Sequence, residues 1–381
     1  MFVDRRVIAH FDWGLLLLTL ILPTIGLAVL YSAGYDPEVN RVLFNWLPIV
    51  VKSNAFFKQL MYFGCGLVAL LVGLSISGQT LSRYAYVLYG ICVLLLVGVF
   101  LFGTVAQGSR RWLTIGAYNL QPSELMKLGL ILGMARYLSK NPPKLNLYGL
   151  KELIVPLLML VVPMGLIIQQ PDLGTALAVG AIGLCMILFM GIRPRLLVIM
   201  AVVALIALIP AWSQLENYQK RRILVLLNPE QDSQGDGWHI IQSKIAVGSG
   251  QFMGKGFLKG TQTQLEFLPE RTTDFIFSVL AEEAGFVGSL IVLLLYLLFI
   301  YKILKVVVKG KDLFSSFVCF GVAVMIFFHT VVNIGMVMGL LPIVGLPLPL
   351  LSYGGSSLLS TMFAVGLVLG VRMRRLVFVT K

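Results

Sequence analysis

The carboxylates between Glu270 and Glu283 are the residues of this sequence best placed to do chemistry. Glu270, Asp274 and the adjacent Glu282 and Glu283 fall within about four helical turns, although the 381 residues include only 17 Asp and Glu. Asp274 directly precedes a long apolar run that starts at Phe275, so it stands at the mouth of a predicted membrane helix. Because a charge at mid-bilayer costs at least about 2.5 kcal/mol, carboxylates near hydrocarbon are usually kept for function.

A purely structural role is the alternative for each of these carboxylates. At the start of a helix, Asp274 can cap an unpaired backbone N–H, a role worth about 1 kcal/mol. Glu282 and Glu283 can form a solvated rim or pair with basic residues of other helices. The residues alone leave this choice open.

Two further groups of polar side chains interrupt apolar segments. Glu124 and Lys127 follow Pro122 at i and i+3, a spacing that allows an ion pair on one helix face. Such a pair must face the bundle interior or a water-filled cavity, where it either fixes helix packing or binds substrate. His329 and Asn333 share a face at i and i+4, and a hydrogen-bonded buried histidine is favoured over a metal ligand.

Basic side chains provide candidate partners for an anionic substrate. Arg110 and Arg111 run against the usual enrichment of positive charge on the cytoplasmic side, and guanidinium groups bind phosphate through paired hydrogen bonds. Lys244 and Lys255 lie in the long connection before Asp274 and extend this basic lining. Long loops tolerate charge in any case, so phosphate binding by any one of these four residues is a hypothesis.

The apolar composition indicates which class of protein positions these groups. Hydrophobic residues make up 58% of the chain and charged residues 12%, which excludes a soluble globular core. A membrane helix needs about 20 apolar residues. About ten such runs occur, at about 12–33, 57–76, 85–104, 122–139, 152–168, 174–190, 195–212, 275–301, 314–337 and 352–371. We therefore predict an all-α polytopic membrane protein with about ten transmembrane helices, forming a single membrane domain over residues 1–381.

The basic residues of the short loops orient these helices. They concentrate on the side that holds the N-terminus, with Arg5, Arg6 and Arg83 among them, so both termini are expected in the cytoplasm. The one long connection, about residues 213–273 between the seventh and eighth helices, is then extracytoplasmic. This asymmetry accounts for most of the net charge of +13, which therefore does not indicate nucleic acid binding. The four cysteines and three histidines show no metal-binding spacing.

Several motifs, in order, resemble the SEDS family of RodA, FtsW and SpoVE over nearly the whole chain. The similarity is carried by Arg110-Arg-Trp, Gln121-Pro-Ser-Glu-Leu-Met-Lys127, Gln170-Pro-Asp-Leu-Gly-Thr-Ala176, Thr273-Asp-Phe-Ile-Phe277 with Glu282-Glu283, and Gly345 to Ser357. The segment from Asn333 to Ser357 is the most specific. Gly237-Trp-His-Ile-Ile-Gln-Ser-Lys-Ile-Ala-Val-Gly-Ser-Gly250 is most similar to the RodA branch, while Gln251 and Thr273 are minor departures.

The resemblance implies a peptidoglycan glycosyltransferase of the bacterial cytoplasmic (inner) membrane. Such an enzyme polymerises lipid II into glycan strands at the outer leaflet during cell elongation, with a class B penicillin-binding transpeptidase and the elongation machinery as partners. In the family, the aspartate that matches Asp274 is essential for activity. The alternatives are a lipid II flippase and a scaffold for the transpeptidase. The predicted position of Asp274 at the outer surface favours an enzyme, since transporter sites lie near the bilayer midplane.

The chemistry of such a transfer assigns roles to the polar residues. A carboxylate that deprotonates the attacking sugar hydroxyl contributes roughly 10²–10⁴-fold, and Asp274 is the candidate general base. Direct attack predicts inversion, with undecaprenyl pyrophosphate leaving. Basic residues or a divalent cation, Mg²⁺ or Mn²⁺, would stabilise the leaving charge, with no cofactor built in. Glu270 would tune Asp274 or hold that ion, Glu124 and Lys127 would shape the cavity, and Ser352 completes the substrate-binding candidates.

Overall fold

The computed structural model describes residues 11–35, 55–106, 109–115, 118–143, 147–214, 216–232, 235–265, 267–268, 270–310 and 312–374. The chain ends, on which the expected cytoplasmic location of both termini depends, lie outside the described residues. The same holds for Arg5 and Arg6.

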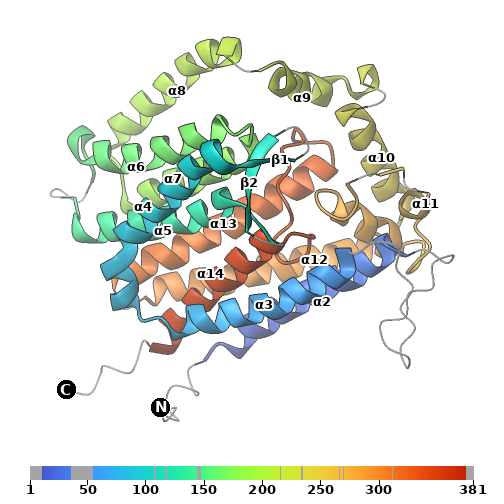
Figure 1. Cartoon of the computed structure of the whole chain (residues 1–381), viewed down its shortest axis with the longest axis horizontal. Helices are drawn as coiled ribbons and strands as arrows, with labels where there is room; N and C mark the ends of the chain where they lie inside the picture. Colours follow the sequence, from blue (N-terminus) through green and yellow to red (C-terminus); the bar gives the residue numbers. More distant parts are fainter. Residues whose placement is uncertain are drawn as a thin grey trace.

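Helices occur at each of the ten predicted apolar runs (Figure 1). They are α2 (Trp13–Ala33), α3 (Ala55–Ser75), α4 (Gly78–Phe102), α5 (Pro122–Lys140), α6 (Leu150–Ile168), α7 (Leu173–Met190), α8 (Pro194–Gln214), α12 (Ile276–Val308), α13 (Leu313–Val337) and α14 (Gly355–Met373). Within the described ranges, eight of them, all except α5 and α8, are long and apolar enough to cross a membrane. The all-α membrane class is confirmed, whereas the count of ten crossings stays a prediction.

Helix α5 is central to the bundle although it carries four charged side chains, Glu124, Lys127, Arg136 and Lys140. From Pro122 to Ala135 almost every side chain is buried. It packs against α4, α7 and α13, and α13 in turn packs against α7, α12 and α14. Protein rather than lipid therefore surrounds the charges of the first turns of α5, which avoids the cost of exposing them to hydrocarbon.

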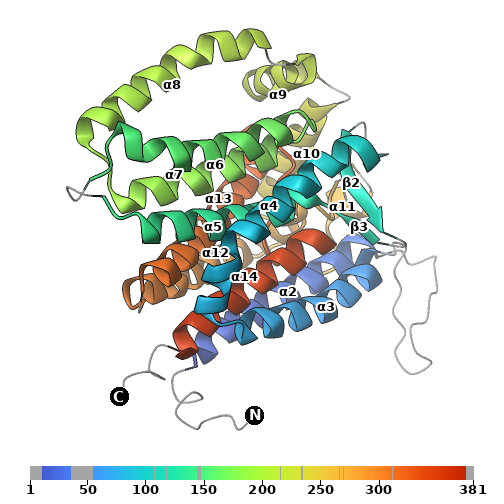
Figure 2. The same cartoon turned by 60° about the vertical axis from the view of Figure 1, so that its left-hand side comes forward.

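The outer helices differ in how closely they pack. Helix α14 lies along α3, and α2 packs against α12 (Figures 1 and 2). Helix α8 stands apart from α6 and α7 in both views. None of its described side chains is buried, and apolar residues such as Val198 and Ile206 are exposed. A helix that is apolar on its exposed faces is suited to contact with lipid.

A three-stranded antiparallel sheet, which was not predicted from the sequence, connects α4 to α5. Strand β1 (Thr104–Ala106) pairs with β2 (Ser109–Ile115), which pairs with β3 (Tyr118–Leu120). Thr104 lies opposite Trp112, and Leu113 lies opposite Leu120. Strand β2 contacts both α4 and α5. It therefore fixes Arg110 and Arg111 between the end of one helix and the start of the next.

The long connection before Asp274 is largely helical. It contains α9 (Asn217–Leu227), the 3₁₀ helix η1 (Pro229–Gln231), α10 (Asp236–Ser249) and α11 (Thr261–Gln264). Helix α10 packs against α12 with Ile240 and Ser243 buried. Helix α9 was not predicted, although the spacing of Glu216 and Gln219 is that of a capping box, and the N–H of Glu216 donates to Gln219 Oε1 at 3.1 Å.

Helix α12 is broken at Gly285, which has φ +66° and ψ −162°. The glycine-rich segment after α10 replaces the helical hydrogen bonds lost there. The bonds are Phe286 N to Gln251 O at 2.9 Å, Val287 N to Phe252 O at 3.2 Å, and Lys255 N to Glu282 O and Gly256 N to Glu283 O at 3.0 Å each. Non-helical backbone is tolerated at membrane depth only when protein groups satisfy it in this way.

The segment that follows α10 also binds the side chain of Glu282, which belongs to the same broken helix. It is fully buried and accepts hydrogen bonds from Lys255 Nζ at 2.7 Å and from the Gln262 N–H at 3.0 Å. The alternative in which Glu282 pairs with a basic residue is therefore confirmed, with a partner from the long connection rather than from another membrane helix.

Replacing Gly285 by alanine is expected to destabilise the protein. A Cβ at this position would lie 2.2 Å from the backbone nitrogen of Gly254, and the positive φ disfavours any L side chain. We expect a loss of about 2 kcal/mol or more in the free energy of unfolding, measured as a lower midpoint of thermal unfolding in detergent. Gly90→Ala in α4 is the matched control, because its added methyl meets nothing within 4 Å. Equal midpoints for the two variants would contradict this account of the break.

Candidate functional site

Asp274 lies in a tight turn that begins at Glu270. The N–H groups of Thr273 and Phe275 both donate to the Glu270 carbonyl at 3.2 Å. The Thr273 hydroxyl donates to Glu270 Oε2 at 3.0 Å. These local bonds keep the carboxylates of Glu270 and Asp274 on one short segment directly before α12.

Residues from other segments hold the backbone of this turn through three of its successive carbonyl oxygens. Each accepts a hydrogen bond from α13 or from the segment that precedes α14. The bonds are Tyr353 N to Thr272 O at 3.0 Å, Ser352 Oγ to Thr273 O at 2.7 Å, and Asn333 Nδ2 to Asp274 O at 2.9 Å. Three anchors on consecutive residues leave the backbone at Asp274 little freedom to move.

Asn333 and Ser352 also bind the proline-rich link between α13 and α14. The fully buried amide of Asn333 donates to Leu346 O at 2.8 Å, and Ser352 Oγ accepts from the N–H of Leu348 at 2.9 Å. The protein interior thus satisfies the irregular backbone of the link, as its depth in the membrane requires. The turn and the link form one hydrogen-bonded unit.

The side chain of Asp274, in contrast, is not bound. The N-cap residue of α12 is Phe275, and no side chain caps the helix. No described residue forms a hydrogen bond or ion pair with the Asp274 carboxylate. A Cβ on Gly345, which has φ +71°, would lie 3.5 Å from Asp274 Oδ2. The structure therefore does not support the capping alternative, and the left-handed turn at Gly345 brings the link close to a free carboxylate.

The surroundings of Asp274 raise its pKa to about 6. The largest cause is burial, which disfavours the charged form, and the second is the negative charge of Glu270. The positive charges of Arg222 and Arg111 act in the opposite direction, and Asp172 adds a further small increase. Two cations, from α9 and β2, thus lie near a carboxylate that titrates close to neutral pH.

Arg111 is only loosely paired. Its Nη1 lies 3.9 Å from Asp172 Oδ1, and its Nε is buried without a hydrogen-bond partner among the described residues. Asp172 caps α7 by accepting from the Thr175 N–H at 3.2 Å, and it also accepts from Gln121 Nε2 at 3.1 Å. A buried N–H without a partner calls for an explanation, and an anionic ligand provides one.

Three of the residues predicted to bind phosphate, Arg110, Lys244 and Lys255, are not among the cations that affect Asp274. The exposed Arg110 donates to Phe100 O at 2.9 Å at the end of α4. Lys255 is paired with Glu282, and the exposed Lys244 packs against Gly339. The structure thus brings Arg111, Glu270 and Asp274 together, with Ser352 holding the turn. A substrate role for Arg110, Lys244 and Lys255 stays a prediction.

Glu124 and Lys127 form a buried ion pair at 2.7 Å, and neither is more than 3% exposed. Lys127 Nζ is also 2.9 Å from His329 Nε2, and Ser360 Oγ donates to Glu124 Oε2 at 3.3 Å. The predicted pairing and the hydrogen-bonded histidine are both confirmed. The cluster ties α5 to α13 and α14, one helical turn along α13 from Asn333, so its observed role is to fix helix packing.

Four residues of this site are not evident from the sequence: Asp172, Arg222, Asn333 and Gly345. In the sequence, Asp172 belongs to a family-like motif and Asn333 shares a helix face with His329, but neither pattern indicates proximity to Asp274. Arg222 was one of three adjacent basic residues in a long loop, with no feature that distinguishes it. A glycine between the prolines of the link was the available signal for Gly345. Among the described residues, no group of three His, Cys, Asp or Glu side chains is arranged to hold a metal ion.

Known proteins match this chain over nearly its whole length. The family model for FtsW, RodA and SpoVE, described as cell cycle protein, matches residues 13–376. Peptidoglycan glycosyltransferase MrdB of Escherichia coli (strain K12) is 41% identical over 371 residues, which cover 96% of this chain and 94% of that protein.

Two solved structures share the fold. One, described as structural coordination of polymerization and crosslinking by a peptidoglycan synthase complex, has a TM-score of 0.79 and 34% identity. A mutant of the rod shape determining protein RodA of Thermus thermophilus has a TM-score of 0.71 and 31% identity. In both cases the match covers 96% of this chain and 98% of the other chain. These similarities confirm the resemblance inferred from the sequence: the chain is a multi-pass bacterial membrane protein, it belongs to the FtsW, RodA and SpoVE family, and it is a glycosyltransferase.

Proposed function

We propose that this protein polymerises lipid II into peptidoglycan glycan strands at the outer leaflet of the cytoplasmic membrane during cell elongation. The name of the similar E. coli protein, peptidoglycan glycosyltransferase, supports the substrate class. One structural observation carries the chemistry. The backbone of Asp274 is anchored at three carbonyls, while its carboxylate has no described partner and a pKa of about 6.

In the proposed reaction, Asp274 acts as the general base. A hydroxyl of the acceptor sugar gives its proton to Asp274 as its oxygen bonds to the anomeric carbon of the donor. The bond from that carbon to the pyrophosphate oxygen breaks, and undecaprenyl pyrophosphate leaves with the electron pair. A single displacement inverts the anomeric carbon. A pKa of about 6 suits this role, because the carboxylate is ionised at neutral pH and remains basic enough to accept a proton.

Arg111 and Arg222 are the cations best placed to stabilise the leaving group. Both are near enough to lower the pKa of Asp274, and Arg111 has an unpaired N–H to offer. Preformed donors directed at a developing negative charge are usually the largest single contribution to catalysis. Arg110, Lys244 and Lys255 would then form an outer basic lining rather than contact the pyrophosphate.

The carboxylates of Glu270 and Asp274 fit a divalent cation, Mg²⁺ or Mn²⁺. Mg²⁺ is commonly bound by one or two protein carboxylates together with substrate phosphates. Glu270 would hold such an ion, which leaves Asp274 as the base. Once bound, the ion would neutralise charge on the pyrophosphate.

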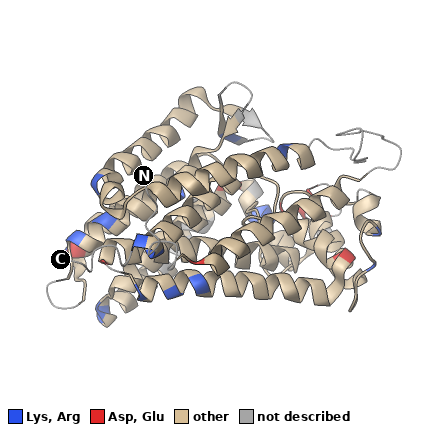
Figure 3. Cartoon of the chain, turned by 90° about the horizontal axis from the view of Figure 1, so that it is seen from below, with Lys and Arg blue, Asp and Glu red and all other residues tan. Residues whose placement is uncertain are grey.

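Orientation and partner follow from the charge distribution and from the similar complex. Lys and Arg residues gather at the end of the bundle where α2 begins and α14 ends (Figure 3), whereas Asp274 precedes α12 at the other end. This supports a cytoplasmic location for the basic end and an outer location for Asp274. The similar synthase complex combines polymerization and crosslinking, which supports a class B penicillin-binding transpeptidase as the partner.

Asp274→Asn is expected to slow polymerisation of labelled lipid II by at least about 10²-fold, because the amide cannot accept the proton. The variant should remain folded, since a neutral side chain costs less to bury than a carboxylate. Glu230→Gln, an exposed acidic residue of the long connection, is the matched control.

Full activity of Asp274→Asn would exclude Asp274 as the base. If the parent protein makes no polymer with or without its transpeptidase and divalent ions, the enzyme proposal fails. A vesicle assay for lipid II transfer across the bilayer then separates a flippase from a scaffold.

Glu270→Gln is expected to shift the pH dependence of kcat/KM to lower pH. The ionised form of Asp274 is the active form, so the parent rate rises with pH through about 6. Removing the charge of Glu270 removes the second cause of the raised pKa, while burial still acts. The measurement is a pH–rate profile at the lowest divalent ion concentration that sustains activity, so that a bound ion does not mask the charge of Glu270. A rising limb that stays in place or moves to higher pH would contradict the assignment.

Asn333→Leu is expected to lower kcat by roughly 10²-fold, because a displacement of about 1 Å in the reacting groups has that effect. The variant also leaves two carbonyls, of Asp274 and Leu346, without their donor. Faster amide hydrogen exchange at residues 272–276 should accompany the loss. Asn141→Leu is the control, since the Asn141 amide bonds to Tyr137 O at an exposed position. A parental kcat for Asn333→Leu would mean that the three anchors are not needed for catalysis.

A further inference from the structure

A cavity of about 760 Å³ lies at the end of the bundle opposite Asp274. Four helix ends form it: the starts of α4 and α13 and the ends of α5 and α14. Asp274 stands before the start of α12, and the far end of α12 leads into α13, so this cavity is separate from the site already described. Its volume falls within the range of roughly 300–1,000 Å³ that is usual for small-molecule sites.

The lining of this cavity is strongly basic. Four cations line it, Arg83, Arg136, Lys140 and Arg374, against one acidic residue among the described lining residues, Asp312. The Asp312 carboxylate is already engaged in capping α13, where it accepts from the N–H of Ser315 at 3.1 Å and from its hydroxyl at 2.8 Å. The cavity therefore carries an excess of positive charge that the surrounding protein does not neutralise.

Two of the cations are held in place by neighbouring groups. Arg374 donates to the carbonyls that end α3, with Nη2 2.6 Å from both Leu74 O and Ser75 O. Arg136 Nη1 donates to Ser82 Oγ at 2.5 Å. These hydrogen bonds fix the positions of the two guanidinium groups in the wall of the cavity.

The other two cations, Arg83 and Lys140, are exposed and form no ion pair with any described residue. The Ser82 hydroxyl lies among the cations and accepts from Arg136, so its own proton remains available to a ligand, whereas Ser139 and Ser315 donate to Arg136 O and to Asp312. This combination of guanidinium, ammonium and hydroxyl donors matches a phosphate group.

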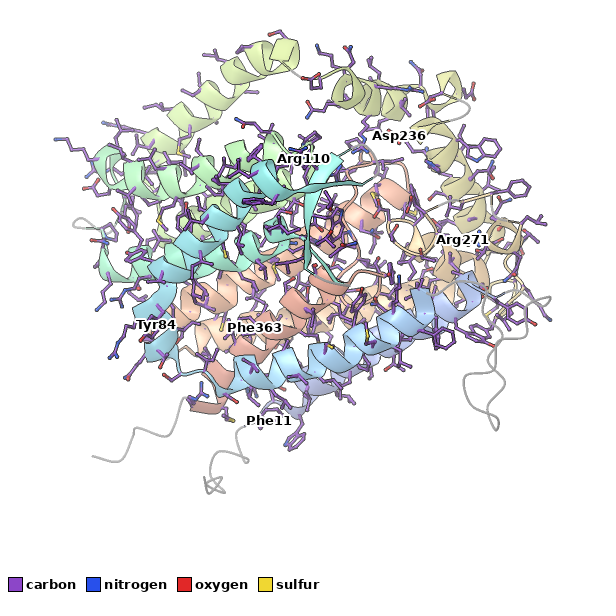
Figure 4. The ribbon with its side chains drawn as sticks, viewed as in Figure 1. Phe11, Tyr84, Arg110, Asp236, Arg271 and Phe363 are labelled. Atoms are coloured by element: carbon purple, nitrogen blue, oxygen red, sulfur yellow. The ribbon has the colours of Figure 1, made fainter. Side chains whose placement is uncertain are left out.

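The position of the cavity indicates the source of the phosphate. The cations lie at the ends of membrane helices, and the lining also includes apolar Leu313, Phe314 and Val371. Tyr84, next to Arg83, is 52% exposed at the same end of the bundle (Figure 4), as is typical of aromatic residues at the membrane interface. We propose that this cavity binds the headgroup of an anionic phospholipid from the leaflet on that side of the membrane. Basic pockets between membrane helices are suited to such headgroups.

The test uses the purified full-length chain in detergent. Dissociation constants are measured for short-chain phosphatidylglycerol, for phosphatidylcholine with the same acyl chains, and for inorganic phosphate. The variant is Arg83→Gln with Lys140→Gln, and each single variant is measured as well. Arg193→Gln with Arg195→Gln is the matched control, because these exposed arginines lie at the same end of the bundle but outside the cavity.

Phosphatidylglycerol should bind more tightly than the other two ligands. The cavity variant should bind it roughly 10- to 30-fold more weakly, as expected for two cations near a charged headgroup, while the control variant binds like the parent. Because both side chains are exposed, the thermal midpoint without ligand should not change. Equal affinity for phosphatidylcholine or for inorganic phosphate would overturn the lipid assignment. A parental affinity for phosphatidylglycerol in the cavity variant would overturn the site.

Discussion

The amide of Asn333 is the interaction on which the rest of the site depends. One buried side chain donates both to the carbonyl of Asp274 and to that of Leu346, so α13 joins the turn before α12 to the link before α14. The adjacent anchors at Thr272 and Thr273 come from that same link. Asp274 is therefore correctly placed only when three helices have packed together. Rigid support from outside the reacting residue is what a catalytic group requires.

The electrostatics of the turn come at a cost in stability. Folding raises the pKa of Asp274 from its ordinary value of 3.8 to about 6, mainly through burial. The folded protein therefore retains a proton that the unfolded chain has already released over this pH range. The stability contributed by this group is full below the lower value and falls as the pH rises through the higher one. At neutral pH the protein thus retains an ionised, poorly solvated carboxylate at the expense of stability, as is common at functional sites.

Apolar runs and local spacing predicted much of this architecture. Each of the ten helices followed from a run of about 20 apolar residues. The Glu124 and Lys127 pair followed from spacing within one turn, because local geometry fixes such contacts. The sheet and α9 were not predicted, because short strands and a polar surface helix give weak patterns. Which cations approach Asp274 depends on contacts between segments about 50 to 160 residues apart in the sequence, and no local pattern specifies them.

The charged interior of α5 has a consequence for how the protein is made. The insertion of a segment from the translocon into the bilayer depends on the hydrophobicity of that segment. Each Glu, Lys or Arg near its centre makes the free energy of insertion less favourable. Glu124 and Lys127 of α5 pair with each other, but their remaining partners, His329 of α13 and Ser360 of α14, are synthesised 202 and 236 residues later. Until then α4, the sheet, α6 and α7 are the neighbours available to it. Glu124 and Lys127 must therefore remain in the membrane without these partners until the second half of the chain has been synthesised and has packed against α5.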